Sequence, residues 1–331
     1  MQIDFARVGC YRSIAEQCVW SNKSQFNIEI GVQAPLLRDH LVPDMLNVVK
    51  QLEPHETLDL TRRQGERFVS DGGGEKLETI LQFIEQMDSK ETNLKQRIGS
   101  DIVCGRGLLV KLAMGKNVRF RAVKRKGVIF MCVESRDFSG YDGNAHMSMK
   151  FEKLMADDPF YMVETDNMRI VRTGIRTKVV NTLTFPEVTV FSSAEVDCRD
   201  QYGDIVELKM TKKTVQENSR KRGTHWKLKE FLQSYLSNTK HILTGYLKKK
   251  EEKFEINELE IVHRDSLIED FRAVEEAIQH LSETLLELKT LLSGNNTAIM
   301  VTGFSIYGLK YEYIEADDCE FVPQEFLCKF D

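Results

Sequence analysis

Two short segments of the chain place ionisable side chains two residues apart between apolar neighbours. The first segment contains Glu195 and Asp197, and the second contains Glu207 and Lys209. Positions i and i+2 of a β-strand face the same side, so each pair shares one face of its strand. If the two segments pair with each other, three carboxylates and one amine meet in a small volume.

The polar residues 199–202 separate these segments and favour a tight hairpin. A hairpin centred on Tyr202 sets Asp197 directly opposite Glu207, with their Cβ atoms about 4.5–5.5 Å apart. Two carboxylates at about 4 Å repel by roughly 4 kcal/mol at an effective dielectric constant of about 20. A divalent cation such as Mg²⁺ or Mn²⁺, which prefers oxygen ligands, relieves this repulsion. The alternative is an edge hairpin with a solvated charged face.

In the same register Glu195 lies opposite Lys209. Carboxylates around a divalent ion, with an amine beside them, are typical of a metal-dependent phosphodiester hydrolase, because the ion activates water and neutralises charge that develops on the phosphate. Burial predicts a lowered pKa for Lys209, which would let this residue exchange protons with the attacking water. The spacing therefore predicts hydrolysis of phosphate esters.

Composition indicates a globular protein in a reducing compartment. The chain has 331 residues, 41% hydrophobic and 29% charged, and we predict one domain over 1–331 with a motif-bearing core over about 98–250. No long apolar run and no signal peptide is evident, so no membrane association is expected. Seven scattered cysteines without C-x-x-C spacing predict free thiols. The net charge of −5 argues against broad nonspecific binding of nucleic acid, although not against an enzyme that grips one RNA end.

Apolar spacing predicts alternating helices and strands. Helices are expected over residues 75–87, 98–114, 147–157, 225–237 and 266–293, and strands over 118–134, 161–193, the two charged segments, 241–247, 258–263 and 297–314. We therefore predict an α/β (α+β) fold in which a mixed central β-sheet is flanked by helices.

The expected helix over 266–293 carries the strongest local signals. Ser266 and Glu269 match a capping box, and Gly294 supplies a C-terminal stop. The apolar residues alternate in steps of four and three. This pattern fits either a coiled-coil seam for a partner or a long helix packed across the domain's own sheet, and we favour the second.

Positive charge is dense at several places in the chain. Clusters occur at Lys111 with residues 116–126, over residues 212–222 and over residues 248–250. Such clusters are most often solvated faces. The first two flank the candidate site in the sequence, which modestly favours contact with phosphate groups there.

Five motifs, in this order, resemble the decapping exoribonuclease (DXO) family of RNA 5′-end quality-control decapping nucleases. They are a helix with an arginine followed by glycine (105–112), a helix that ends in Lys-Phe-Glu (148–152), Glu-Val-Asp (195–197), Glu-Leu-Lys (207–209) and Gln-Ser-Tyr-Leu (233–236). Each motif is weak alone, but the ordered set is fairly specific. The resemblance implies the restriction-endonuclease-like PD-(D/E)XK nuclease core.

The resemblance also implies a role for each matching residue. Metal ligands, for one or two Mg²⁺ or Mn²⁺ ions, would be Glu152, Glu195, Asp197, Glu207 and the backbone carbonyl of Leu208. Catalytic roles would fall on Glu195, Asp197, Glu207, Lys209 and Gln233, with the last two orienting or activating water. Substrate-binding roles would fall on Glu75, Gly105, Arg106, Gly107, Glu195, Lys209 and Gln233.

Two positions depart from the family pattern, since Ser148 stands in place of a glycine and Gln17 in place of a substrate-contacting arginine. The implied activity is a metal-dependent RNA 5′-end hydrolase. It would remove incomplete or NAD caps, release pyrophosphate from 5′-triphosphate RNA, or degrade RNA from 5′ to 3′. Implied partners are RNA 5′ ends and a 5′→3′ exoribonuclease, in the nucleus or the cytosol, with the nucleus preferred. A catalytically weak scaffold and a DNA endonuclease remain as alternatives.

Overall fold

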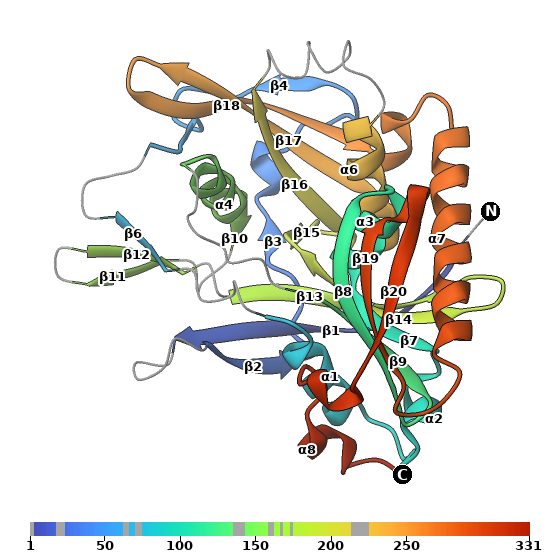
Figure 1. Ribbon diagram of the computed structural model, residues 1–331. Helices are drawn as coiled ribbons and strands as arrows, with labels where there is room; N and C mark the ends of the chain where they lie inside the picture. The colour runs from blue at the N-terminus through green and yellow to red at the C-terminus, as the bar shows by residue number, and fades with distance from the viewer. Residues whose placement is uncertain are drawn as a thin grey trace.

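The computed structural model describes residues 3–17, 24–61, 66–69, 75–134, 143–157, 162–165, 168–172, 175–212 and 225–331. Two large β-sheets meet near the middle of the molecule, and helices lie around them (Figure 1). The predicted mixed α/β fold is confirmed. Within the described residues, no helix is long and apolar enough to cross a membrane.

The larger sheet has nine strands in the order β2-β1-β13-β14-β7-β9-β8-β19-β20. β7 runs parallel to both of its neighbours, β14 and β9, and the other pairs are antiparallel, so the sheet is mixed. The strands are β1 (Asp4–Gln17), β2 (Ser24–Ile30), β7 (Ile102–Gly105), β8 (Asn117–Arg125), β9 (Val128–Val133), β13 (Ile175–Thr184), β14 (Thr189–Val196), β19 (Ala298–Phe304) and β20 (Gly308–Ile314).

The second sheet has eight strands, seven of them in the order β10-β3-β15-β16-β17-β18-β4, with β5 also paired to β18. These strands are β3 (Leu36–Leu37), β4 (Val49–Gln51), β5 (Leu58–Asp59), β10 (Ala156–Asp157), β15 (Cys198–Arg199), β16 (Ile205–Lys212), β17 (His241–Lys250) and β18 (Lys253–His263). A small third sheet joins β11 (Met162–Thr165), β12 (Met168–Arg172) and β6 (Glu66–Val69).

Helices cover both faces of the larger sheet. Leu109, Phe231 and Leu285 come from three helices that share one apolar core on one face, and Ile84 and Phe326 come from two helices that share the core of the opposite face. The helices are α1 (Glu78–Gln86), α2 (Leu94–Ile98), α3 (Arg106–Ala113), α4 (Gly143–Met155), α6 (His225–Leu236), α7 (Arg272–Leu291) and α8 (Gln324–Leu327). The first core belongs to α3, α6 and α7, and the second to α1, α2 and α8.

The chain passes from one large sheet to the other within three residues. β14 ends at Val196 in the larger sheet, and β15 begins at Cys198 in the second sheet. Asp197 lies between them, and Val196 and Cys198 are both buried on either side of it. The first charged segment is therefore positioned where the two sheets meet.

The helix predicted over 98–114 is wrong in its first half. α2 ends at Ile98, and Gly99 in the left-handed conformation (φ 64°) stops it. Residues Ile102–Gly105 form β7, in which Ile102 faces one core and Val103 the other. A strand buried on both faces shows no polar alternation, so its sequence looks like the start of the helix that follows.

The predicted capping box is also wrong. Residues Arg264–Leu267 form a 3₁₀ helix, and α7 begins only at Arg272. The Ser266 hydroxyl donates to the backbone carbonyl of His263 at 2.7 Å. Because Ser266 is used in this earlier turn, it does not cap α7.

The preferred packing of the long helix is confirmed. Three of its four-three residues, Ile278, Leu281 and Leu285, fill the core against the larger sheet and are at most 1% exposed, whereas Phe271 at the start of the pattern is 44% exposed. The helix ends at Leu291, shortly before the predicted stop at Gly294. The apolar seam is therefore the domain's own core and not a free face for a partner helix.

Candidate active site

The charged hairpin has the predicted register at its tip. Cys198 pairs with Val206 and Arg199 with Ile205, which centres the hairpin on Tyr202. The ladder stops there, and Glu195 pairs with Lys178 of β13 instead of the predicted Lys209. The reason is that β14 has already joined the larger sheet before it reaches the hairpin.

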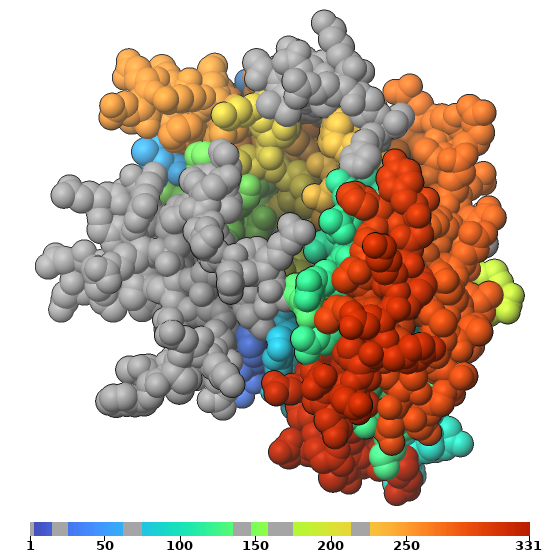
Figure 2. Space-filling view, viewed as in Figure 1, coloured from blue at the N-terminus to red at the C-terminus, as the bar shows by residue number. Residues whose placement is uncertain are grey.

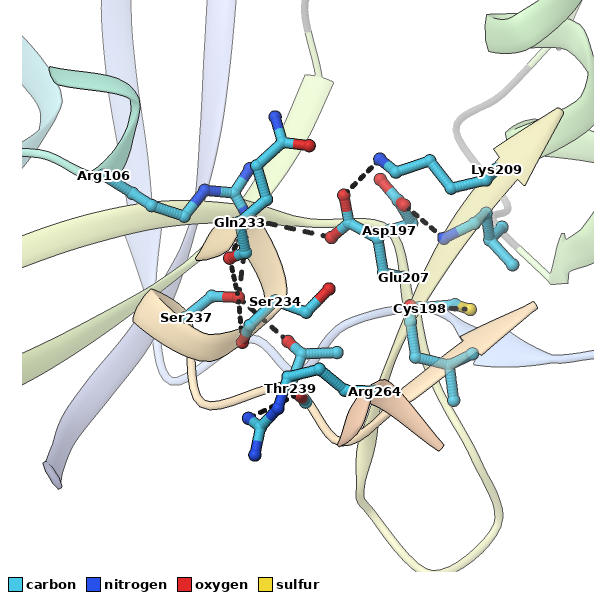
Figure 3. A network of polar contacts seen from close by, with 12 residues as sticks. Arg106, Asp197, Cys198, Glu207, Lys209, Gln233, Ser234, Ser237, Thr239 and Arg264 are labelled. Atoms are coloured by element: carbon cyan, nitrogen blue, oxygen red, sulfur yellow. Dashed lines mark hydrogen bonds and ion pairs between the residues drawn. The ribbon is translucent and has the colours of Figure 1, made fainter. Parts of the chain in front are cut away.

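Asp197 is held by a backbone hydrogen bond across this junction. The backbone N–H of Leu208 donates to Asp197 Oδ2 at 2.6 Å (Figure 3). Burial raises the pKa of Asp197 to about 7, and the nearby Glu207 carboxylate adds to the increase. This hydrogen bond and Lys209 act in the opposite direction. The carboxyl is thus oriented by the backbone but incompletely neutralised.

A cavity of about 210 Å³ brings three of the predicted metal ligands together. Glu152 enters it from α4, and Glu195 and Asp197 enter it from the end of β14. Burial raises the pKa of Glu152 well above its usual value, and repulsion from Asp197 and then Glu195 raises it further. A cavity lined by acids that resist ionisation is a favourable environment for a cation.

Glu207 does not line this cavity, and its carboxylate contacts two cations. Its side chain is 4% exposed, and its Oε1 accepts from Lys209 Nζ at 2.5 Å while its Oε2 lies 3.7 Å from Arg106 Nη1 (Figure 3). Burial acts to raise the pKa of Glu207, but Lys209 and Arg106 outweigh it and hold the pKa below its usual value. Glu207 Oε2 accepts no hydrogen bond within the described part of the chain.

The predicted lowering of the Lys209 pKa is wrong. Burial does act to lower it, but the carboxylates of Glu207 and Asp197 prevail and raise it above its usual range. In this arrangement Lys209 is a fixed cation between two acids. It is suited to orienting a water molecule or neutralising charge, and not to accepting a proton.

Arg106 begins α3 and points toward α6. Its Nη1 lies 3.4 Å from both the Gln233 carbonyl and the Ser237 hydroxyl, in addition to Glu207 (Figure 3). Its side chain is 14% exposed. The Gln233 side chain extends from α6 beside Arg106. The structure therefore places Arg106, Glu207, Lys209 and Gln233 in one polar cluster.

Glu75 lies in a separate buried network. It accepts hydrogen bonds from Lys178 and from Thr79, whose hydroxyl is 2.9 Å from the Tyr11 hydroxyl. The carboxylate also lines a second, larger cavity together with Gly105 and Gly107. The three residues thus share one surface, and their role as substrate contacts stays a prediction.

Among the described residues, no three His, Cys, Asp or Glu side chains are close enough to hold a metal ion as they stand. The Glu207 carboxylate contacts Lys209 and Arg106 instead. Glu195 Oε2 accepts a hydrogen bond from Arg176 Nη1 at 3.1 Å. The donor set nevertheless fits a hard divalent ion in type. Asp197 and Glu152 have raised pKa values, and Glu207 has an oxygen without a hydrogen bond. The assignment of these four acids and Leu208 as ligands stays a prediction.

Three residues of this region were missed from the sequence. Arg176 lines the acid cavity and pairs with Glu195, and Lys178, two residues later on β13, holds Glu75. Glu230 lies one turn before Gln233 on α6, and burial raises its pKa to about 7. The spacing of Glu230 and Gln233, which puts both on one face of a helix, was the one sequence signal that could have identified Glu230. Arg176 and Lys178 reach the site only because β13 pairs with β14.

The two departures from the family pattern lie on elements near the site. Ser148 is on α4, four residues before Glu152, and is half-buried. Gln17 is the last residue of β1 and pairs with Ser24 of β2. Ser148 therefore lies one helical turn from a predicted ligand.

Comparison with known proteins decides the family. The model of the family described as RAI1 like PD-(D/E)XK nuclease matches residues 38–327. The chain belongs to this family. Decapping nuclease dom-3 of Caenorhabditis elegans is 30% identical over 309 residues, a match that covers 84% of this chain and 77% of that protein. These matches confirm the resemblance to decapping nucleases that the sequence motifs indicated.

Solved structures show the same fold at low identity. Scheffersomyces stipitis Rai1, in complex with (3′-NADP)⁺ and a calcium ion, has a TM-score of 0.71 at 12% identity and covers 99% of this chain and 96% of its own. Candida albicans Rai1, in complex with pU5 and Mn²⁺, has a TM-score of 0.67 at 12% identity with the same coverage of both chains. The RAI1-like fold is thus retained along nearly the whole chain.

Proposed function

We propose that this chain is a metal-dependent hydrolase of RNA 5′ ends that removes incomplete or NAD caps, releases pyrophosphate from 5′-triphosphate RNA, or cleaves nucleotides from the 5′ end. The observation that carries the proposal is the meeting of Glu152, Glu195 and Asp197 in one cavity beside the Glu207–Lys209 pair. The decapping activity named for the dom-3 relative supports it. So do the nucleotide and RNA ligands of the two Rai1 structures.

The cation belongs to the proposal. Mn²⁺ and calcium accompany the ligands in the Rai1 structures, and hard divalent ions prefer the carboxylate and carbonyl oxygens found here. Glu152, Glu195, Asp197 and Glu207, with the carbonyl of Leu208, would hold Mg²⁺ or Mn²⁺. When bound, such an ion activates water and neutralises charge on a phosphate.

The other residues of the cluster orient the reactants. Leu208 N–H fixes the direction of the Asp197 carboxylate. Lys209 is anchored by Glu207 at 2.5 Å and keeps its charge beside the acids, where it stabilises negative charge that develops on phosphate oxygens. Arg106 offers a planar fork of donors suited to phosphate, held in place by the Gln233 carbonyl and Ser237.

The test uses purified protein and RNAs labelled at the 5′ end with an unmethylated cap, an NAD cap, a triphosphate or a monophosphate. We expect a product that requires Mg²⁺ or Mn²⁺ and that disappears in a Glu195→Ala/Asp197→Ala variant. Absence of metal-dependent product from every end type overturns the proposal. Degradation of duplex DNA without a free 5′ end would instead identify a DNA endonuclease.

The scaffold alternative loses one of its two sequence arguments in this structure. It rested on the four-three seam over 266–293 and on the acidic pI, and the seam residues from Val274 to Leu292 are buried in the domain's own core. RNA binding that needs no metal and gives no turnover is the result that would restore it.

We also propose that the protein works in the nucleus, with the cytosol as the other compartment. The described cysteines are all free, which suits a reducing compartment, and the preference for the nucleus comes from the family's work on RNA 5′ ends. A fluorescent fusion at native expression level is expected to accumulate in the nucleus. Exclusion from the nucleus contradicts this assignment.

A further inference from the structure

Arg176 lies among the predicted metal ligands although it carries a full positive charge. It is the second residue of β13 and lines the acid cavity together with Glu152, Glu195 and Asp197. Its Nη1 donates to Glu195 Oε2 at 3.1 Å. In Figure 2 the green surface of α4, which carries Glu152, and the olive surface of β16 lie in a hollow on this face of the molecule. A cation of the protein itself thus already contacts one of the predicted ligands.

The ion pair between Arg176 and Glu195 is accessible to solvent. The two side chains are 26% and 42% exposed. Lys178, two residues further on the same face of β13, pairs with Glu75, and those two side chains are only 11% and 9% exposed. Breaking a buried ion pair is costly, whereas an exposed pair contributes little to stability. Arg176 can therefore release Glu195 at low cost, whereas Lys178 belongs to the fold.

The charge of Arg176 opposes a metal ion in this cavity. Asp197 is oriented by a neutral donor, the backbone N–H of Leu208 at 2.6 Å, which does not repel a cation. The Arg176 guanidinium stays charged at any pH at which proteins fold. Its repulsion from a divalent ion is twice that between two single charges at the same distance. Arg176 therefore competes with the ion for Glu195 instead of merely orienting this carboxylate.

This competition accounts for the arrangement of the acids. Among the residues that the structure describes, no three acids are close enough to bind a metal ion as they stand. The pairing of β14 with β13 places the Glu195 backbone at the cavity, but its carboxylate is bonded to Arg176. A cation that takes this carboxylate from Arg176 completes a set with Glu152 and Asp197.

We propose that Arg176 is a built-in competitor of the divalent cation, which neutralises Glu195 in the metal-free protein and must release it before the cation binds. The inference rests on the proposed function for the identity of the cation site, and it adds the residue that sets the affinity of this site. The site is then filled only above a threshold concentration of the ion.

The first test measures metal binding without RNA and without catalysis. Mn²⁺ is titrated by calorimetry into the metal-free wild type and into Arg176→Ala. We expect the variant to bind Mn²⁺ about tenfold more tightly, because a full positive charge beside the ion is lost. Unchanged binding overturns the inference, and weaker binding overturns it in favour of a residue that orients Glu195.

Two variants control for charge and for position. Arg176→Lys keeps the charge and is expected to bind Mn²⁺ as the wild type does. Arg12→Ala removes the same charge from β1, where the neighbouring Ser13 pairs directly with Arg176, so that Arg12 lies on the opposite face of the sheet. Tightening in either control equal to that in Arg176→Ala overturns the inference.

The salt dependence tests whether the competition is electrostatic. The titrations are repeated in about 0.1 M and about 1 M KCl, between which the Debye length falls from about 10 Å to about 3 Å. Because the ion pair is partly exposed, we expect the difference between the wild type and Arg176→Ala to shrink to about threefold or less at high salt. A difference that does not change with salt contradicts the inference.

The stability of the metal-free protein gives a second readout. At pH 8 Arg176→Ala leaves Glu195 without this counter-ion beside Glu152 and Asp197, so we expect its urea midpoint to lie below that of the wild type. Saturating Mn²⁺ should raise the midpoint of the variant more than that of the wild type. A smaller increase in the variant overturns the inference. If Arg176→Ala does not fold without metal, Arg176→Gln, which keeps a donor without the charge, replaces it in every arm.

A final arm separates this inference from the proposed function. The Mn²⁺ concentration that half-saturates hydrolysis of a 5′-labelled RNA is expected to fall about tenfold in Arg176→Ala. Hydrolysis with an unchanged half-saturating concentration overturns the inference. No hydrolysis by the wild type rejects the proposed function, and the calorimetric titration still decides the role of Arg176.

Discussion

Two aspartates at opposite ends of β14 show opposite electrostatic behaviour. Asp101 precedes β7 and lies among two lysines and the backbone of Thr189, with Lys95 Nζ at 2.5 Å and Lys289 Nζ at 3.0 Å. Burial opposes ionisation, but these partners hold its pKa well below the usual value. Asp197 has the backbone N–H of Leu208 and repelling acids around it, and its pKa is raised to about 7.

The contrast indicates that the Asp101 carboxylate stabilises the fold, whereas the Asp197 carboxylate belongs to the candidate active site. Asp101 is satisfied by groups of its own chain, so it ties β7 and β14 to α7. The pKa values of Asp197 and Glu152 stay raised by burial and by neighbouring carboxylates, although Lys209 partly offsets both increases. Perturbed acids in a cavity mark functional sites with greater frequency than structural ones. A site of this kind is stabilised by a cation from outside.

The largest expected effect comes from neutralising the functional aspartate. Asp197→Asn removes a predicted metal ligand while keeping an oxygen that accepts from Leu208 N–H. We expect RNA 5′-end hydrolysis to fall about 1,000-fold. At pH 8 the metal-free variant is expected to be more stable than the wild type, because the raised pKa means that ionised Asp197 destabilises the fold. Single-turnover assays and urea unfolding measure the two quantities.

The pH dependence of this difference has a definite sign. Protonated Asp197 is favoured in the folded state, so its contribution to stability is present below the unfolded pKa of about 3.9. It is lost as the pH rises toward about 7. Asp204→Asn, on the same hairpin and half-exposed, is the matched control. A wild type that is more stable than Asp197→Asn at pH 8 without metal contradicts the comparison.

The second prediction concerns the lysine beside a buried carboxylate in each region, Lys209 beside Glu207 and Lys289 beside Asp101. Among the described residues, Lys209→Met leaves Glu207, 4% exposed, with Arg106 at 3.7 Å as its remaining cation. Removing one partner of a buried ion pair costs about 3 kcal/mol of unfolding free energy. Lys289→Met leaves Asp101 with Lys95 and, because the lysine is partly exposed, costs about 1 kcal/mol or less. Chemical denaturation at pH 7 compares the two, and equal losses would show that the regions do not differ.

Substitution of the structural aspartate is expected to have a smaller effect than Lys209→Met. Asp101→Asn loses charge-assisted hydrogen bonds to Lys95 and Lys289, which are partly exposed, so we expect a loss of about 1–2 kcal/mol at pH 7. Because the folded pKa is depressed, this stabilisation is present above the unfolded pKa of about 3.9 and is lost as the pH falls below it. Hydrolysis is expected to stay within about twofold of the wild type, and a larger loss of activity would connect Asp101 to the site.

Local charge patterns predicted the hairpin because its register depends on sequence spacing alone. The spacing of Asp197 and Glu207 fits a hairpin centred on Tyr202, and the pairing of Cys198 with Val206 agrees with this centre. The same reasoning failed at Glu195, because β14 has a different neighbour there. A strand that changes sheets leaves no mark in its own sequence.

The remaining errors have tertiary causes. The apolar pattern predicts helix over β7 because both faces of this strand are buried, with Ile102 and Val103 at 0% exposure. Arg176 and Lys178 reach the acids only through the pairing of β13 with β14. The pKa of Lys209 was predicted from burial alone, whereas two neighbouring carboxylates determine its direction.

The most direct test of the account is calorimetric titration of Mn²⁺ into the metal-free protein at pH 6 and pH 8, in buffers of different ionisation enthalpy. Since the pKa of Asp197 is about 7 and that of Glu152 is also raised, we expect binding to release about one proton or more at pH 6 and to be tighter at pH 8. Asp197→Asn should lose this binding, whereas Asp101→Asn should retain it. No binding by the wild type, or binding without proton release at pH 6, would contradict the claim that Asp197 and Glu152 are ligands of a divalent cation.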